Sequence, residues 1–257
     1  MSIKNEQFLK ELQPFMRMTV IPGVTVGDLG FSSAQSIFST GYIATTGTDN
    51  FGGNRDLDLF QAAIGDNGQG LAAGQVMTRG QTNWLDTGGK LPANEVFVGI
   101  RCAFSVYRHD NSDVALTAGA SFAATGAVQS SQVLIPSVDS LYMLLKEFSW
   151  EYQTGDGIIR NSGALAGYPQ AGGVWEPPTQ FTTIGAQANP AIGAQNGYPC
   201  ATVGRDLPIP FIFLPNINTR VKIKSGTALT TQAGTFLEHQ FLAIRQTIQG
   251  YKLTMPV

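Results

Sequence analysis

The residues that could carry acid–base or nucleophilic chemistry are few and widely spaced. The chain has two histidines, His109 and His239, and two cysteines, Cys102 and Cys200. A catalytic triad needs a base beside its nucleophile and a third group that orients the base. The sequence contains no Gly-x-Ser-x-Gly elbow and no known cysteine-protease motif. We therefore expect no nucleophilic catalysis, and we leave open whether Cys102 and Cys200 form a disulfide.

Metal and carboxylate chemistry is weakly supported as well. Asp and Asn side chains gather at residues 54–58 and 110–113, but neither cluster has the spacing, the glycine and the distal glutamate of a calcium loop. The two cysteines lack the short paired spacing of a zinc site. Glu147 and Glu151 are the nominal carboxylate pair of a glycosidase, and the alternative is a solvated strand face. We expect no metal, no cofactor and no enzymatic activity.

Phosphate and nucleic-acid binding are also disfavoured. The segment Gly65 to Gly70 lacks the lysine and the strand–turn–helix context of a phosphate-binding loop. Arg220, Lys222 and Lys224 alternate along one strand, a pattern more typical of a solvent-facing strand than of contact with nucleic acid or anionic lipid. A net charge of −2 and a pI near 5.7 provide no overall basic surface for sequence-specific nucleic-acid binding.

The elements that would position any site are mostly strands. The clearest is a long strand that begins near Val96. Its apolar residues alternate with small or polar ones, which predicts a sheet with one buried face. The residues predicted to share that face are Val96, Val98, Ile100, Cys102, Phe104 and Val106.

Further strands are predicted on both sides of this one. They span about 36–45, 114–124, 128–135, 146–153, 207–214, 217–224 and 236–253, with Gly250 as a bulge or a point of close approach. Residues 57–64 fit a short helix or a strand. Asn5 to Met16 is the best helix, and Pro14 limits its last turn. This pattern predicts an all-β fold, an antiparallel β-sandwich with long loops and an N-terminal helix or arm.

We divide the chain into an N-terminal helix with extended arm or loops (1–81) and a β-sandwich (82–257). The sandwich carries a Gly/Pro-rich insertion at about 161–204, in which Glu176 is the sole charged residue. Charged residues make up 13% of the chain, against about 25% in typical soluble proteins. Interface cores are depleted of charge, so we expect self-assembly. The residues expected to contact neighbouring subunits are Phe8, Leu9, Leu12, Phe15, Met16, Tyr168, Trp175, Phe181 and Tyr198. For the first five, we favour a helix that packs on its own domain over a terminal arm that docks on a neighbouring subunit or on a membrane surface.

Three stretches resemble the jelly-roll capsid proteins of tailless icosahedral viruses, especially bacterial ones. They are Thr82-Asn83 through Gly89-Lys90-Leu91-Pro92 into Phe97-Val98-Gly99-Ile100; the Trp150 strand with Gly155-Asp156 and Gly172-Gly173; and Leu207 to Ile223 with Ala243 to Leu253 around Gly250. The resemblance implies a non-catalytic coat subunit, with loops in inter-subunit contacts and an N-terminal arm towards the shell interior. It allows a double jelly roll as the alternative to a single one.

If the resemblance holds, the partners are copies of this chain in a symmetric shell, and other virion proteins or an internal membrane are further candidates. The sequence contains no apolar run of transmembrane length and no signal-peptide core, so we expect synthesis in the host cytoplasm and residence in the virion. The alternative function is a carbohydrate-binding or adhesin-type β-sandwich, in which Trp84, Trp150 and Trp175 would form a sugar platform.

Overall fold

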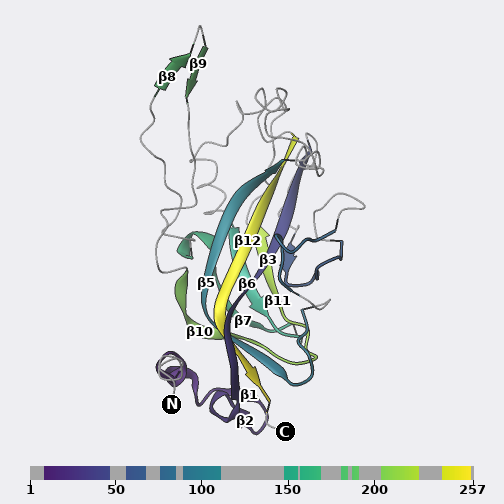
Figure 1. Ribbon diagram of the computed structural model, residues 1–257, viewed down its shortest axis with the longest axis vertical. Helices are drawn as coiled ribbons and strands as arrows, with labels where there is room; N and C mark the ends of the chain where they lie inside the picture. The colour runs from purple at the N-terminus through teal and green to yellow at the C-terminus, as the bar shows by residue number, and fades with distance from the viewer. Residues whose placement is uncertain are drawn as a thin grey trace.

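The computed structural model describes residues 9–46, 56–67, 76–84, 89–110, 148–155, 157–168, 181–184, 187–190, 204–225 and 239–255. Two four-stranded antiparallel sheets dominate it (Figure 1). The long-strand sheet has the order β10-β5-β12-β3 (Arg205–Phe213, Glu95–Asp110, His239–Thr254 and Gly30–Thr46). The short-strand sheet has the order β4-β11-β6-β7 (Leu57–Leu59, Arg220–Ser225, Phe148–Gln153 and Ile159–Ala164). The predicted all-β sandwich is confirmed.

The pairing of these eight strands follows one rule. The first strand pairs with the last, β3 with β12, and successive pairs move inwards along the chain as β4–β11, β5–β10 and β6–β7. Two further pairs, β5–β12 and β6–β11, join the ladders into sheets. A long antiparallel hairpin rolled into two facing sheets has this topology, which defines the jelly roll. The described residues form one such roll.

The role expected for residues 1–81 is wrong in one respect. β3 pairs with β12 along its whole length, and β4 belongs to the short-strand sheet, so both strands are part of the sandwich. A strand was predicted at about 36–45, within β3, but its full length and its place in the sandwich were not, because the segment is rich in Ser, Thr and Gly and only Ile37 and Tyr42 among its described apolar side chains are buried. The sandwich therefore begins near residue 30 and not at residue 82.

Aromatic side chains fill the space between the two sheets. Trp150 lies 5.4 Å from Phe211 between ring centroids, and Tyr152 stacks on Phe211 at 4.5 Å. Phe213 contacts the rings of Phe60, Trp84 and Phe97. Because this inter-sheet core is packed with rings, the predicted sugar platform is wrong for two of its three tryptophans: Trp84 is 3% exposed and Trp150 0%.

The long strand β5 is buried on both faces. Gln249 pairs with Arg101 and Gly250 with Gly99, so Ile100 has no partner on β12 and forms a bulge. A bulge reverses which face each side chain occupies. Before it, Val96 and Val98 point away from the inter-sheet core. After it, Cys102 and Phe104 point into that core, so the predicted single apolar face is wrong.

The N-terminal segment covers the second buried face. Residues 9–12 are α-helical and are followed by the 3-10 turn η1 (Gln13–Phe15), the hairpin β1–β2 (Thr19–Ile21 and Val24–Thr25) and the 3-10 turn η2 (Val26–Asp28). This segment packs at one end of the long-strand sheet (Figure 1). Its buried residues join those of the sheet in an outer core: Leu12, Val20, Val26, Leu29, Val96, Val98, Ile100, Tyr251 and Leu253.

The remaining described elements are small. The 3-10 turn η6 (Leu165–Gly167) follows β7, and β8 (Phe181–Ile184) pairs with β9 (Gln187–Pro190) in a separate two-stranded sheet. The strands predicted at 114–124 and 128–135 lie outside the described residues. Within the described part of the chain, no helix has the length and apolar content needed to cross a membrane.

Gly250 gives a test of the bulge. A Cβ at this position would lie 2.0 Å from the carbonyl oxygen of Val98, a backbone atom that cannot yield without moving β5. We expect Gly250→Ala to lower the free energy of unfolding by about 1–3 kcal/mol, the usual cost of overpacking. Gly80→Ala is the control, because its Cβ would meet nothing nearer than 3.8 Å. Equal urea midpoints for the two variants would contradict the bulge geometry.

Candidate functional site

The N-terminal residues expected to contact a neighbour are mostly occupied within their own chain. Leu12 is 0% exposed in the outer core, and Phe15 and Met16 pack against it. Leu9 is 38% exposed and remains on the surface. Phe8 lies outside the described residues. The described part of the helix thus packs on its own domain, which is the interpretation that the sequence favours.

Of the contact residues expected in the Gly/Pro-rich insertion, the structure describes the side chain of Tyr168 alone. Tyr168 packs edge-on against Trp150 at 5.4 Å, and the guanidinium of Arg205 lies 5.5 Å from its ring centroid. Tyr168 thus packs against the inter-sheet core of its own sandwich. Trp175 and Tyr198 lie outside the described residues, and Phe181 belongs to β8 but its side chain is not described. The inter-subunit role of these residues stays a prediction.

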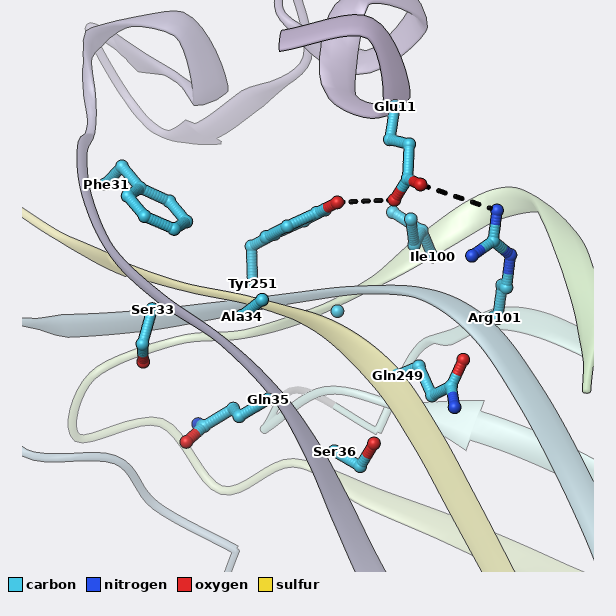
Figure 2. A pocket seen from close by; sticks show the side chains of 11 residues that line it. Glu11, Phe31, Ser33, Ala34, Gln35, Ser36, Ile100, Arg101, Gln249 and Tyr251 are labelled. Atoms are coloured by element: carbon cyan, nitrogen blue, oxygen red, sulfur yellow. Dashed lines mark hydrogen bonds and ion pairs between the residues drawn. The ribbon is translucent and has the colours of Figure 1, made fainter. Parts of the chain in front are cut away.

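A groove of about 680 Å³ lies between the N-terminal helix and the long-strand sheet (Figure 2). The carboxylate of Glu11 stands at its rim and accepts a hydrogen bond from the hydroxyl of Tyr251. A second carboxylate oxygen of Glu11 lies 3.8 Å from Nη2 of Arg101, and Nε of Arg101 donates to Asp206 at 2.6 Å. One network therefore joins the helix to β12, β5 and β10.

Two donors of this network, Tyr251 and Arg101, have raised pKa values. Burial raises the pKa of the Tyr251 phenol, and the hydrogen bond to Glu11 and its negative charge raise that pKa further. The hydrogen bond from Arg101 to Asp206 raises the pKa of the guanidinium. Both groups remain protonated donors, so the network suits holding the helix in place and does not suit proton transfer.

Aromatic, hydroxyl and amide side chains line the rest of the groove. Phe31 is 40% exposed, and its ring lies edge-on to Tyr251 with centroids 6.2 Å apart. Ser36 and Gln249 face each other across β3 and β12 and also line the groove. Sequence reasoning missed this groove because its residues come from four separated segments.

A second groove, of about 880 Å³, lies beside the end of the sandwich where β6 turns into β7. Most of its wall is apolar, with Lys90 and Arg160 as the charged members. Its apolar residues come from the N-terminal hairpin, from β10 and from the loop that follows it: Met18, Val20, Ile209, Pro210, Ile212, Leu214 and Ile217. This groove suits an apolar partner better than a polar ligand.

The basic strand residues are neutralised by neighbouring carboxylates. Nζ of Lys222 lies 2.9 Å from Asp56, and Nζ of Lys224 lies 2.9 Å from Glu151. Arg220 lies 3.7 Å from Asp58. This ladder across β4, β11 and β6 carries no net positive charge, so it does not support the nucleic-acid or lipid alternative.

The same ladder accounts for the carboxylates considered for chemistry. Glu151 pairs with Lys224 and accepts a hydrogen bond from Gln153 at 2.9 Å, while Glu147 lies outside the described residues. Asp56 and Asp58 belong to ion pairs with Lys222 and not to a cluster of oxygen ligands. The part of the chain that the structure describes contains no group of three metal-ligating side chains.

Cys102 is a free thiol, 1% exposed in the inter-sheet core. Burial raises its pKa, which keeps the thiol protonated and unreactive. Cys200 lies outside the described residues. His109 and His239 lie on β5 and β12, within the ladder that joins these strands or β12 to β3.

Comparisons with protein families, with curated proteins and with solved structures returned no match for this chain.

The Glu11–Tyr251 hydrogen bond predicts an energetic coupling between helix and sheet. Glu11→Ala and Tyr251→Phe should each destabilise the protein, and the double variant should lose less than the sum, with a coupling of about 1 kcal/mol. The measurement is urea unfolding of the four proteins of the cycle. Purely additive losses would show that the two side chains act independently.

The burial of Cys102 predicts that its thiol reacts slowly in the folded protein. In a Cys200→Ser background, a thiol reagent at pH 8 should modify Cys102 at least about 100-fold more slowly in the folded protein than in urea, because the thiol is buried and protonated. The readout is the release of the coloured thiolate over time. A folded-state rate near that of a free thiol would contradict this placement.

Proposed function

We propose that this protein is a self-assembling structural subunit, the coat protein of an icosahedral virion. The observation that carries the proposal is the strand order. Eight strands pair from the outermost inwards into a single jelly roll, an architecture that viral coats use repeatedly. The fold alone is shared with lectins and with enzymes, so further features must favour one use.

The packed interior favours a function on the outside of the sandwich. Jelly rolls that bind small molecules inside the roll need open space between the sheets, whereas here Trp150, Phe211, Phe213 and their neighbours fill the inter-sheet core. The surfaces left for recognition are edges, grooves and loops. These are the regions through which a subunit contacts its neighbours.

The distribution of charge favours contacts between subunits. Charged residues make up 13% of the chain, and several of those that are described are used within the subunit, as in the β4–β11–β6 ladder and the Arg101 network. Interface cores are depleted of charge, and closed shells bury much of each subunit's surface. A polar but uncharged surface fits this use.

Mass in solution tests the proposal. Light scattering after size exclusion, with negative-stain imaging of any large fraction, should show closed particles far above the 27.4 kDa of one chain. Raising the salt concentration should not dissolve the particles, because few charges are available to the contacts. A protein that stays monomeric across a wide range of concentration and salt would overturn the proposal.

A further inference from the structure

The 880 Å³ groove beside the turn from β6 to β7 combines an apolar wall with positive charge. Lys90 and Arg160 are the charged residues among those described as lining it, and no aspartate or glutamate is among them. Lysine and arginine side chains are positively charged at neutral pH. A concave apolar wall encloses the apolar part of a ligand, and cations beside it select for a negative charge on that ligand.

Both cations are placed to act on a bound anion. Lys90 is exposed, and within the described part of the chain no carboxylate pairs with it. Nε of Arg160 donates to the neutral hydroxyl of Thr154 at 3.1 Å. Burial raises the pKa of the Tyr152 phenol in the groove wall, and the hydrogen bond to the Ile212 backbone and the charge of Arg160 oppose that rise. The positive charge of Arg160 is therefore felt inside the groove.

The backbone of the wall favours an alkyl chain over a peptide strand. An extended peptide binds through main-chain hydrogen bonds. Here the Ile209 carbonyl already accepts from the side chain of Asn161 at 3.3 Å, and the Ile212 carbonyl accepts from the hydroxyl of Tyr152. Pro210, between them, has no N–H to donate. These groups are less available to a peptide, whereas an alkyl chain needs no hydrogen-bond partner.

We propose that this groove binds a long-chain carboxylate, with the alkyl chain along the apolar wall and the carboxylate towards Lys90 and Arg160. Ammonium and guanidinium groups form strong, charge-assisted hydrogen bonds with carboxylates. The volume of 880 Å³ lies within the roughly 300–1,000 Å³ of sites that hold small organic ligands. The inference goes beyond the proposed coat function and does not depend on self-assembly.

The shape of the site favours a single chain over a bilayer. A surface that binds a membrane must itself enter the headgroup layer with its apolar side chains. In this groove the apolar side chains line a hollow, which a single chain can enter and a bilayer surface cannot. The ligand class is therefore a free amphiphile.

Equilibrium dialysis with radiolabelled dodecanoate, below its micelle concentration, tests the site on the full chain. We expect about one dodecanoate bound per chain. Octanoate should bind at least about tenfold more weakly, because it buries fewer methylene groups. Dodecyltrimethylammonium, which has the same chain and a positive head, should bind at least about fivefold more weakly, because Lys90 and Arg160 repel it.

Two variants test the residues, each with a matched control. The double variant Lys90→Gln, Arg160→Gln should weaken dodecanoate binding at least about threefold at low salt, and Arg79→Gln, an exposed arginine that does not line the groove, should leave it unchanged. Ile209→Glu should weaken binding at least about tenfold, because it brings a negative charge to the wall. Val76→Glu is its control, since the two side chains are 47% and 50% exposed and Val76 lies outside the groove.

Circular dichroism confirms the folding of each variant, and if Ile209→Glu does not fold, the double variant decides the outcome. Dodecanoate that does not bind, or that binds both groove variants as tightly as the wild type, overturns the inference. Equal affinity for dodecanoate and the ammonium analogue overturns the assignment of a carboxylate. Protein that floats with phosphatidylglycerol vesicles and does not bind dodecanoate overturns the inference in favour of a membrane surface.

The result is independent of the proposed function. Particles that do not bind dodecanoate overturn the groove inference and leave the coat function standing. A protein that stays monomeric and binds dodecanoate in the expected order overturns the coat function and supports the groove inference.

Discussion

Side chains of a β-strand alternate between two faces, and one unpaired residue reverses that assignment for everything beyond it. In this protein the reversal falls at Ile100, which lies between the Gly99–Gly250 and Arg101–Gln249 pairs of the β5–β12 ladder. It allows β5 to supply Phe97 and Phe104 to the inter-sheet core and Val96 and Val98 to the outer core. The N-terminal segment packs on this second apolar face and removes it from solvent. The N-terminal segment does not cover the whole of this face, and the groove of Figure 2 lies where the cover ends.

The strands with strong alternation were predictable from the sequence. β5, β6, β10, β11 and β12 follow apolar periodicity and are bounded by Gly or Pro turns, and the close approach at Gly250 was anticipated. The two buried faces of β5 were not predictable, because an unbroken run of alternating apolar residues reads the same with or without a bulge. β3 was predicted too short for a different reason: its first six residues, Gly30 to Gln35, are mostly small or polar and carry no apolar alternation.

The candidate site was less predictable than the fold. The network of Glu11, Tyr251 and Arg101 joins residues that are far apart in sequence, and no local pattern links a glutamate in an N-terminal helix to a tyrosine in the last strand.

The pairing of the first strand with the last has a consequence for biosynthesis. Gly30 and Thr254 meet in the ladder of β3 and β12 across 224 residues of chain. At roughly 5–20 residues per second, the ribosome needs on the order of ten seconds or more to deliver the partner of β3. The jelly roll therefore closes only after translation has passed its final strand, and its high contact order makes that closure slow. Until β12 has been synthesised, β3 has no ladder partner, and its apolar side chains Ile37 and Tyr42 lack the packing that the closed sandwich gives them.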